Sequence, residues 1–230
     1  MIEEPPLLRI RPSFPRPTPE QVAAFQGVAT GLVCDAMLGR GVLDHRIKPL
    51  PANLDTIVAG PVLPVECGPG DILALLASFK FIQAGDIVMS ATDAYEGCAA
   101  AGDRVTGMLK NNGAAAFVTD GMVRDTVGIH DVGLPVWSAG VSPNTPFTTG
   151  PGTVGLPIQI GGQLIHPGDI LVADRDGAVV VPLAEVDVVV ERLARVIEVE
   201  NALDREIEQG LRLPEDIATL LDSDKVAYLD

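Results

Sequence analysis

The segment GDRVTGMLKNNGAAAFVTDGMVRD, residues 102–125, carries the most informative local pattern of the chain. A helical stretch stops at Gly113, an apolar strand follows, and a glycine turn then precedes the adjacent pair Arg124 and Asp125. A helix followed by a buried strand is the repeating unit of α/β proteins. The segment therefore predicts a fold class and also a place where charged side chains gather.

Further strands and helices are predicted on both sides of this segment. Apolar runs bounded by glycine predict strands at 57–64, 86–90, 114–119, 134–138, 170–173 and 178–182. Apolar residues at helical spacing predict helices that begin near Thr18 and cover 32–38, 71–83, 100–111 and 183–210. Together they indicate a strand-rich α/β core with a C-terminal helix that projects from it and has an apolar face to bury, for which a neighbouring subunit is one candidate.

The N-terminal residues differ in composition from the rest. Six prolines fall within residues 1–19, so residues 1–18 are predicted to form an extended N-terminal arm. Thr18 then has the features of a helix N-cap, with Pro19 at the first helical position and Gln21 as the capping-box partner. Residues 19–230 are predicted to form a single domain.

Charge and hydropathy exclude several classes of protein. The formal net charge is −15, from 31 acidic and 16 basic residues, which argues against nucleic-acid binding. No apolar run approaches the length of about 20 residues that a membrane span needs, and no signal peptide is recognisable. Three scattered cysteines without a CxxC pair favour a reduced compartment. A soluble, cytoplasmic protein is therefore expected.

The ends of the segment 102–125 offer complementary chemistry. The first backbone N–H groups of a helix have no partner inside it, so those of Gly102, Asp103, Arg104 and Val105 can receive a carboxylate. Arg124 offers a planar fork to a carboxylate, and Asp125 offers oxygen to a hard cation such as Mg²⁺ or Mn²⁺. These groups meet the needs of a 2-oxo acid substrate whose enolate is stabilised by a metal acting as Lewis acid.

Taken alone, the Arg-Asp pair is better explained as an ordinary surface ion pair, because such pairs are common. A Schiff-base aldolase would need a buried lysine, and Lys80 is the one lysine with apolar neighbours, although an outward-facing position on a helix suits it better. The three histidines, His45, His130 and His166, lack zinc-ligand spacing, and His130 could at most assist proton transfer.

Two other patterns favour a structural role over a chemical one. Asp174 and Asp176 share features with a calcium-binding loop, but the glycine and glutamate positions do not fit, which favours a turn before a strand. The cysteines are expected to pack as small apolar residues, with Cys98 nearest the proposed site.

The segment resembles the signature of the family that includes the regulator of ribonuclease activity A and the 4-hydroxy-4-methyl-2-oxoglutarate aldolases. The resemblance is carried within the segment by GDRVT at 102–106, NG at 112–113, VTDG at 118–121 and VRD at 123–125. It extends over nearly the whole chain through CDAMLGRGVLDHRIKPL at 34–50, LPVWSAGVSPNTP at 134–146 and IGGQLIHPGDILVADRDGAVVVP at 160–182. Such a collinear set is far more specific than any single motif.

The resemblance implies a swivelling β/β/α-type core, flanked by helices and assembled as a homotrimer or homohexamer with sites between subunits. It implies that the backbone at 102–105 and Arg124 bind substrate, and that Asp125 holds Mg²⁺ or Mn²⁺ partly through water. It also places an acidic residue of a neighbour's C-terminal helix near the metal, for which Glu200 is the first candidate and Glu198 the second.

The activity implied is a metal-dependent aldolase or decarboxylase that acts on a small 2-oxo acid. Asp103 and Arg104 replace the family's Glu-Leu, which puts the substrate specificity in doubt more than the reaction class. The same family contains non-enzymatic regulators that bind and inhibit a ribonuclease, and this remains the alternative function.

Overall fold

The longest strand, β3 (Val58–Glu66), is the central strand of the structure, a computed structural model that describes residues 6–51 and 55–229. Its second half pairs in parallel with β4 (Ile87–Ala91), and its first half pairs antiparallel with β13 (Ile170–Ala173). Parallel strands continue outward from β4 through β6 (Ala116–Thr119) to β8 (Val136–Ser138). All residues of β4, β6 and β8 are buried, as expected for parallel strands covered on both faces.

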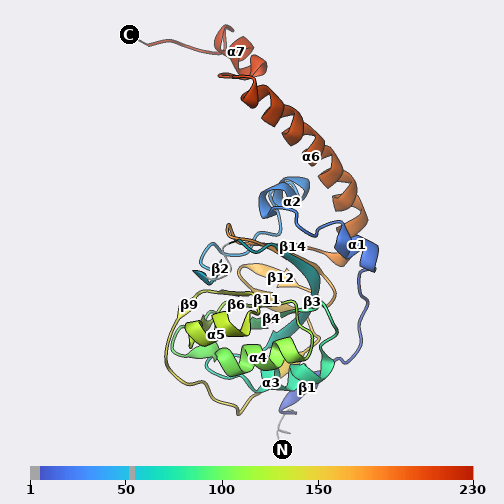
Figure 1. The fold of residues 1–230 in the computed structure, drawn as a ribbon, viewed down its shortest axis with the longest axis vertical. Coiled ribbons are helices and arrows are strands. Elements are labelled where there is room, and N and C mark those ends of the chain that lie inside the picture. The colour runs from blue at the N-terminus through green and yellow to red at the C-terminus, as the bar shows by residue number, and fades with distance from the viewer. Residues whose placement is uncertain (1–5, 52–54, 230) are drawn as a thin grey trace, which may run out of the picture. The chain divides into compact units, whose positions relative to one another are not determined.

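Helices cover one face of this parallel sheet. The connections between successive strands contain α3 (Leu73–Ser78) with the short 3₁₀ turn η2 (Phe79–Phe81), α4 (Asp103–Asn111) and α5 (Thr126–Val132). Figure 1 shows α3, α4 and α5 grouped together below β4 and β6. Side chains at alternate strand positions, Leu63, Val88 and Phe117 among them, join this helical side in one apolar core.

Strands cover the other face. The intervening positions of the same strands, such as Met89 and Val118, pack in a second core with residues of two antiparallel hairpins. These hairpins are β11 (Ile158–Ile160) with β12 (Gln163–Ile165), and β13 with β14 (Ala178–Val181). Helix α2 (Thr30–Ala36) contacts β13 and β14 from outside. The three layers confirm the predicted β/β/α-type core.

A separate three-stranded parallel sheet carries the segment of interest. It consists of β5 (Ala99–Ala101), β7 (Met122–Val123) and β9 (Gly140–Val141). The predicted start of a helix at Ala100 is therefore wrong, because the helix begins only at Asp103. Burial of the three alanines of β5 in a strand pairing outweighs the high helix propensity of alanine.

The N-terminal residues join the main sheet at its edge. Strand β1 (Leu8–Ile10) pairs in parallel with β10 (Gly152–Val154), which pairs in turn with the end of β3. Thr18 caps α1 (Pro19–Ala23) with the complete capping box expected from Gln21, at 3.2 and 2.9 Å. At the opposite edge, β2 (Lys48–Pro49) pairs with β8.

The chain divides into two compact units, Met1–Leu193 and Ala194–Asp230. The long C-terminal helix expected from sequence is present as α6 (Val186–Glu208), preceded by the 3₁₀ turn η3 (Leu183–Glu185) and followed by α7 (Glu215–Leu221). Its first two turns bury Val186, Val189 and Leu193, whereas no residue from 194 to 229 is buried. Over the described residues, none of the helices is both long and apolar enough to cross a membrane.

The buried carboxylate of Asp71 connects α3 to the loop that leads into β10. It accepts hydrogen bonds from the backbone N–H groups of Leu73 (2.7 Å), Thr149 and Gly150 (2.9 Å) and from the Thr149 hydroxyl (3.1 Å). Burial raises the pKa of Asp71, but these donors together outweigh it and hold the pKa below its ordinary value.

Replacing Asp71 with Asn is expected to lower the free energy of unfolding by about 1–3 kcal/mol, because the amide group cannot accept all four hydrogen bonds. The depressed pKa means that the stabilisation by Asp71 is present above the unfolded-state value of about 4 and is lost as pH falls through the folded-state pKa. The difference between wild type and Asp71→Asn in urea denaturation should therefore shrink below about pH 4.

Asp131→Asn is the control, because the Asp131 side chain is 73% exposed. Equal stabilities of wild type and Asp71→Asn at pH 7 would contradict the structural role of Asp71.

Candidate active site

The site residues predicted within the segment 102–125 lie in one open cavity of the first unit. A cavity of about 470 Å³ is lined by Gly102, Asp103, Arg104, Val105, Arg124, Asp125, Val141 and Pro143. The structure thus brings together all six residues predicted from the segment 102–125. Two short turns form the cavity wall, one from β5 into α4 and the other from β7 into α5.

A backbone hydrogen bond holds the two turns together. The N–H of Arg124 donates to the carbonyl of Ala101 at 3.0 Å, directly beyond the paired residues of β5 and β7. The N–H of Ser142 donates to the carbonyl of Val123 at 2.9 Å, which adds the residues after β9 to the same edge. The site is therefore formed where three parallel strands end side by side, the usual position for ligand sites in parallel sheets.

Gly102 is packed directly against the Arg-Asp pair. A methyl group at this position would lie 2.8 Å from Asp125 Oδ2 and 3.2 Å from Arg124 Cγ. The backbone of Gly102 is extended, so its requirement for glycine comes from the close approach and not from its torsion angles. This contact fixes the start of α4 beside the carboxylate of Asp125.

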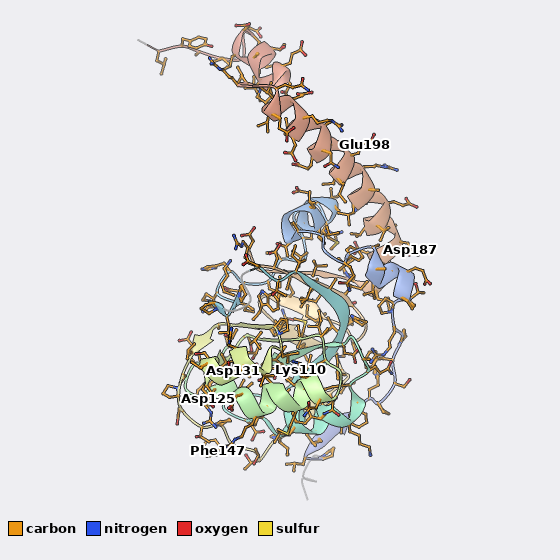
Figure 2. The ribbon with its side chains drawn as sticks, viewed as in Figure 1. Lys110, Asp125, Asp131, Phe147, Asp187 and Glu198 are labelled. Atoms are coloured by element: carbon orange, nitrogen blue, oxygen red, sulfur yellow. The ribbon has the colours of Figure 1, made fainter. Side chains whose placement is uncertain are left out.

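Asp125 has an uncommon backbone conformation. It occupies the left-handed region, with φ 54° and ψ 44°, at the N-cap of α5, where its carbonyl accepts from the N–H of Ile129 at 2.9 Å. Aspartate tolerates this conformation better than most residues. Its carboxylate does not cap the helix and stays half exposed, 3.4 Å from Nε of Arg124. Figure 2 shows Asp125 near α5.

Arg124 is held by two neighbours. Besides its contact with Asp125, its Nη1 donates to the hydroxyl of Thr145 at 2.9 Å. Asn144 fixes this loop in turn, because its carbonyl accepts from the N–H of Ala99 at 3.0 Å and its side chain donates to the carbonyl of Gly97 at 2.8 Å. The guanidinium is thereby oriented and still partly open to the solvent.

The start of α4 keeps three of the four predicted donors available. The Asp103 carboxylate accepts from the N–H of Arg104 at 2.7 Å, so this amide is already used. Across the described residues, the amides of Gly102, Asp103 and Val105 have no hydrogen-bond partner, as expected for the start of a helix. Three backbone donors and the Arg124 fork are therefore available to a ligand beside the half-exposed carboxylate of Asp125.

The Asp125 carboxylate suits a hydrated magnesium-type ion. No group of three or more His, Cys, Asp or Glu side chains that could hold a metal occurs within residues 6–51 and 55–229. An ion bound here would have Asp125 as its ligand from this unit and would keep several water molecules, as Mg²⁺ commonly does. Glu200 and Glu198 lie exposed on α6 in the second unit, and their approach to a metal stays a prediction (Figure 2 labels Glu198).

Three further residues, Val141, Pro143 and Thr145, belong to the site although no role was predicted for them. Val141 and Pro143 add an apolar part to the cavity wall, and Thr145 orients Arg124. All three belong to the family-like stretch 134–146, so a signal was present, but their roles depend on how β9 lies beside β7.

The side chains weighed as alternatives do not line this cavity. Lys80 is exposed on η2, as the simpler interpretation predicted. His130 lies on α5, not on a loop, with its side chain 66% exposed beside Asp131. Burial raises the pKa of Cys98, and that of Cys67 to about 11, which agrees with packing and not with reactivity.

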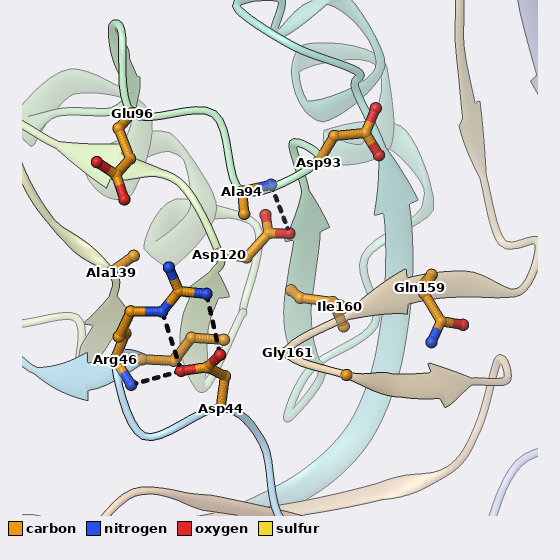
Figure 3. A pocket seen from close by; sticks show the side chains of 12 residues that line it. Asp44, Arg46, Asp93, Ala94, Glu96, Asp120, Ala139, Gln159, Ile160 and Gly161 are labelled. Atoms are coloured by element: carbon orange, nitrogen blue, oxygen red, sulfur yellow. Dashed lines mark hydrogen bonds and ion pairs between the residues drawn. The ribbon is translucent and has the colours of Figure 1, made fainter.

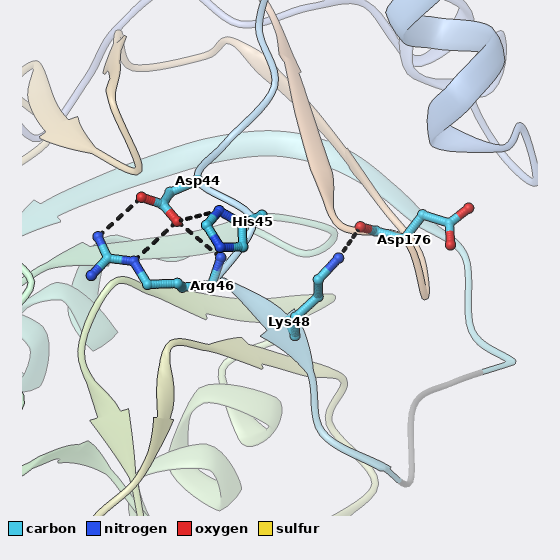
Figure 4. Close-up of polar contacts among 5 residues, drawn as sticks. All are labelled: Asp44, His45, Arg46, Lys48 and Asp176. Carbon is cyan, nitrogen blue, oxygen red and sulfur yellow. Dashed lines mark hydrogen bonds and ion pairs between the residues drawn. The ribbon is translucent and has the colours of Figure 1, made fainter.

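The two aspartates of the calcium-like pattern also have a structural role. The buried Asp174 carboxylate accepts from the N–H and the hydroxyl of Thr30, both at 2.8 Å, and from the N–H of Asp176 at 2.8 Å. The carbonyl of Asp176 accepts from Lys48, as Figure 4 shows. The predicted turn before β14 is therefore confirmed.

A second, smaller cavity of about 280 Å³ was not expected from the sequence. Its polar lining includes Asp44, Arg46, Asp93, Glu96 and Asp120 (Figure 3). Three of these groups have partners inside the protein. The Asp120 carboxylate accepts from the N–H groups of Thr92 (2.7 Å) and Ala94 (3.0 Å). The Arg46 fork binds Asp44 at 3.1 and 3.0 Å and is the main reason why the pKa of Asp44 falls to about 2 (Figures 3 and 4).

Comparisons with known proteins identify the family of the chain. The profile of the RraA-like family, described as Aldolase/RraA, matches residues 30–180. A protein of Halalkalibacterium halodurans, named "Putative 4-hydroxy-4-methyl-2-oxoglutarate aldolase", is 34% identical over 192 residues, which are 83% of this chain and 90% of that protein.

Solved structures share the fold. RraAS2 of Streptomyces coelicolor, described as an unusual member of the RNase ES inhibitor RraA protein family, superposes with a TM-score of 0.74 at 27% identity and covers 83% of this chain and all of that one. An uncharacterized protein of Pseudomonas syringae pv. tomato DC3000 has a TM-score of 0.76 at 24% identity, covers 87% of this chain and 93% of its own, and supports the fold alone. The chain belongs to the RraA-like (Aldolase/RraA) family.

Proposed function

We propose that the protein is a divalent-metal-dependent carbon–carbon lyase that cleaves or decarboxylates a small 2-oxo acid and releases pyruvate. The observation that carries the proposal is the cavity in which the first turn of α4, Arg124 and Asp125 meet. An activity such as that of a 4-hydroxy-4-methyl-2-oxoglutarate aldolase, with decarboxylation of oxaloacetate, is supported by the name of the relative from H. halodurans.

In the proposed mechanism, the chain binds and orients the 2-oxo acid. The amides of Asp103 and Val105 and the fork of Arg124 hold its carboxylate, and Thr145 keeps the guanidinium in position. Asp125 holds the metal, Mg²⁺ or Mn²⁺, which when bound supplies Lewis acidity at the 2-oxo oxygen. In an aldol cleavage the bond between C3 and C4 breaks while the C4 hydroxyl gives its proton to water, so that C4 becomes the carbonyl of the second product; in a decarboxylation C4 leaves as CO₂. In both cases the electron pair of the broken bond stays on C3, and protonation of C3 gives pyruvate.

The assembly is part of the proposal. A homotrimer or homohexamer would allow Glu200, or Glu198, of a neighbouring subunit to approach the metal. In its support, the second unit leaves Val199, Leu203 and Ile207 exposed at four-residue intervals along α6, which gives the helix an uncovered apolar stripe. The assembly mass in light scattering decides between these states and a 24.1 kDa monomer.

The compartment remains a proposal as well. All three cysteines are free, which supports the reducing cytoplasm expected from sequence.

A non-enzymatic regulator that binds and inhibits a ribonuclease is the second candidate function. It is supported by the description of the S. coelicolor structure as a member of an RNase inhibitor family. The retained Arg124 and Asp125 favour the enzyme, because binding a protein partner does not require a guanidinium and a carboxylate arranged for a 2-oxo acid and a metal.

The proposal is tested by assaying pyruvate release from a panel of 2-oxo acids that includes oxaloacetate. Turnover is expected with Mg²⁺ or Mn²⁺, loss of turnover in excess EDTA, and recovery when the metal is restored. Turnover that persists in EDTA, together with borohydride trapping of substrate on Lys80, would instead establish a Schiff-base mechanism. Absence of turnover on the whole panel would favour the regulator.

Arg124→Lys and Asp125→Ala should both lower the catalytic activity, but for different reasons. Arg124→Lys keeps the charge but loses the planar fork, so substrate affinity should fall by about 1.5–3 kcal/mol, mainly through KM. Asp125→Ala removes the metal ligand, so kcat should collapse and partly recover at high Mg²⁺. Both residues are partly exposed, so both variants should fold, although Asp125→Ala should lose about 1 kcal/mol of stability because alanine is disfavoured in the left-handed backbone conformation of this position. If both variants kept near wild-type turnover, Arg124 and Asp125 would be an ordinary surface ion pair and their assignment to the active site would be wrong.

Gly102→Ala should weaken metal binding without changing any charged group. The added methyl group requires the Asp125 carboxylate to move, because it would lie 2.8 Å from Oδ2. We expect Mn²⁺ affinity, measured by electron paramagnetic resonance of the free ion, to fall roughly tenfold or more.

Gly107→Ala is the matched control on the same helix, because its methyl group would meet only Val132 Cγ2 at 3.8 Å. This control should bind Mn²⁺ as wild type does and gain up to about 1 kcal/mol of stability. If Gly102→Ala left the Mn²⁺ affinity unchanged, the assignment of Asp125 as a metal ligand would be wrong.

A further inference from the structure

The cavity contains a cation that the proposed mechanism does not use. Arg104 is the second residue of α4 and is exposed, and it and Arg124 are the basic residues of the cavity lining. Arg124 contacts Asp125 and Thr145. Over the described parts of the chain, by contrast, the guanidinium of Arg104 forms no ion pair or hydrogen bond.

The two acidic residues of the cavity are engaged elsewhere. The Asp103 carboxylate accepts from the backbone N–H of Arg104 at 2.7 Å, and it is packed against α5, where a methyl group on Gly128 would meet Asp103 Oδ2 at 2.8 Å. The Asp125 carboxylate faces Nε of Arg124 at 3.4 Å. Neither of them neutralises Arg104, although the chain as a whole has a net charge of −15.

The position of Arg104 would allow its side chain to contact the end of a substrate that is distant from the 2-oxo acid group. Its backbone neighbours Asp103 and Val105 provide free amides for the 2-oxo acid group, so its side chain starts at the same turn and can reach several ångströms beyond it. Val141 and Pro143 provide the apolar part of the lining, which would suit a neutral substrate tail. The guanidinium provides a planar fork that would suit a second carboxylate.

We propose that Arg104 is a specificity-determining residue that binds the distal carboxylate of the substrate. The substrates named under the proposed function are 2-oxo diacids, and the preference for them over 2-oxo acids of the same length with a neutral tail then depends on Arg104. This inference rests on the proposed function and adds to it the residue that selects the substrate. It concerns binding of the tail and not the bond-breaking step.

Two substrates that differ only in the tail test the inference. 4-Hydroxy-2-oxoglutarate ends in a carboxylate and 4-hydroxy-2-oxopentanoate ends in a methyl group, and both release pyruvate on cleavage. Wild type should show the higher kcat/KM for the diacid. Arg104→Gln should lower kcat/KM for the diacid by about 10- to 100-fold and change that for the methyl substrate by less than about threefold.

Two further variants complete the experiment. Arg104→Lys should restore part of the diacid preference, because it keeps the charge without the fork. Arg11→Gln removes one positive charge from an exposed position outside the cavity and should leave both substrates unaffected.

The two possible failures are distinguishable. If wild type cleaves both substrates and Arg104→Gln changes them equally or not at all, Arg104 does not select the tail, while the proposed function stands. If wild type with Mg²⁺ or Mn²⁺ cleaves neither substrate and no other 2-oxo acid, the proposed function fails and the inference fails with it.

Discussion

The site depends on one backbone hydrogen bond, from the N–H of Arg124 to the carbonyl of Ala101. This bond extends the pairing of β5 with β7 by one residue and places the start of α4 beside the start of α5. Gly102 then approaches Asp125 so closely that a methyl group on Gly102 would lie 2.8 Å from the Asp125 carboxylate, which would have to move. The amide donors, the guanidinium and the carboxylate are therefore positioned by backbone geometry, which a substrate or metal does not have to organise.

The layers of the fold account for the rigidity of this arrangement. The parallel strands β3, β4, β6 and β8 are covered by helices on one face and by antiparallel hairpins on the other. The short sheet β5–β7–β9 is made from the residues that follow β4, β6 and β8 in sequence, so its position is fixed by the core. Loops supported in this way provide the charged side chains while the core provides stability.

The six strands expected from apolar runs were all predictable, because a short apolar run bounded by glycine is typical of a buried strand. Strand β5 was not predictable, since its three alanines favour a helix locally and only pairing with β7 makes them a strand. Likewise, α3 is shorter than its apolar spacing indicated, because the chain tightens into a 3₁₀ turn at Phe79. Local patterns thus identify the long buried strands. They do not identify helix α5 or the shorter strands, which are β1, β2, β5, β7, β9, β10, β11 and β12.

For the site as well, some residues could be predicted from the sequence and others could not. Those within the segment 102–125 were predicted as one group from their closeness in sequence and the family resemblance, and the structure places them around one cavity. Thr145 was not, since its contact with Arg124 spans 21 residues and depends on the path of the loop after β9. The use of the Arg104 amide by Asp103 was also hidden, because it depends on a side-chain orientation that no sequence pattern specifies.

The central claim, that this cavity binds a metal together with a 2-oxo acid, is tested most directly by a crystal structure with Mn²⁺ and oxalate, a stable analogue of pyruvate enolate. The account predicts an anomalous Mn²⁺ peak beside the carboxylate of Asp125, directly or through one water, with oxalate against Arg124 and the first turn of α4. An anomalous peak in the cavity lined by Asp44, Asp93 and Asp120, or no peak in either cavity, would contradict it.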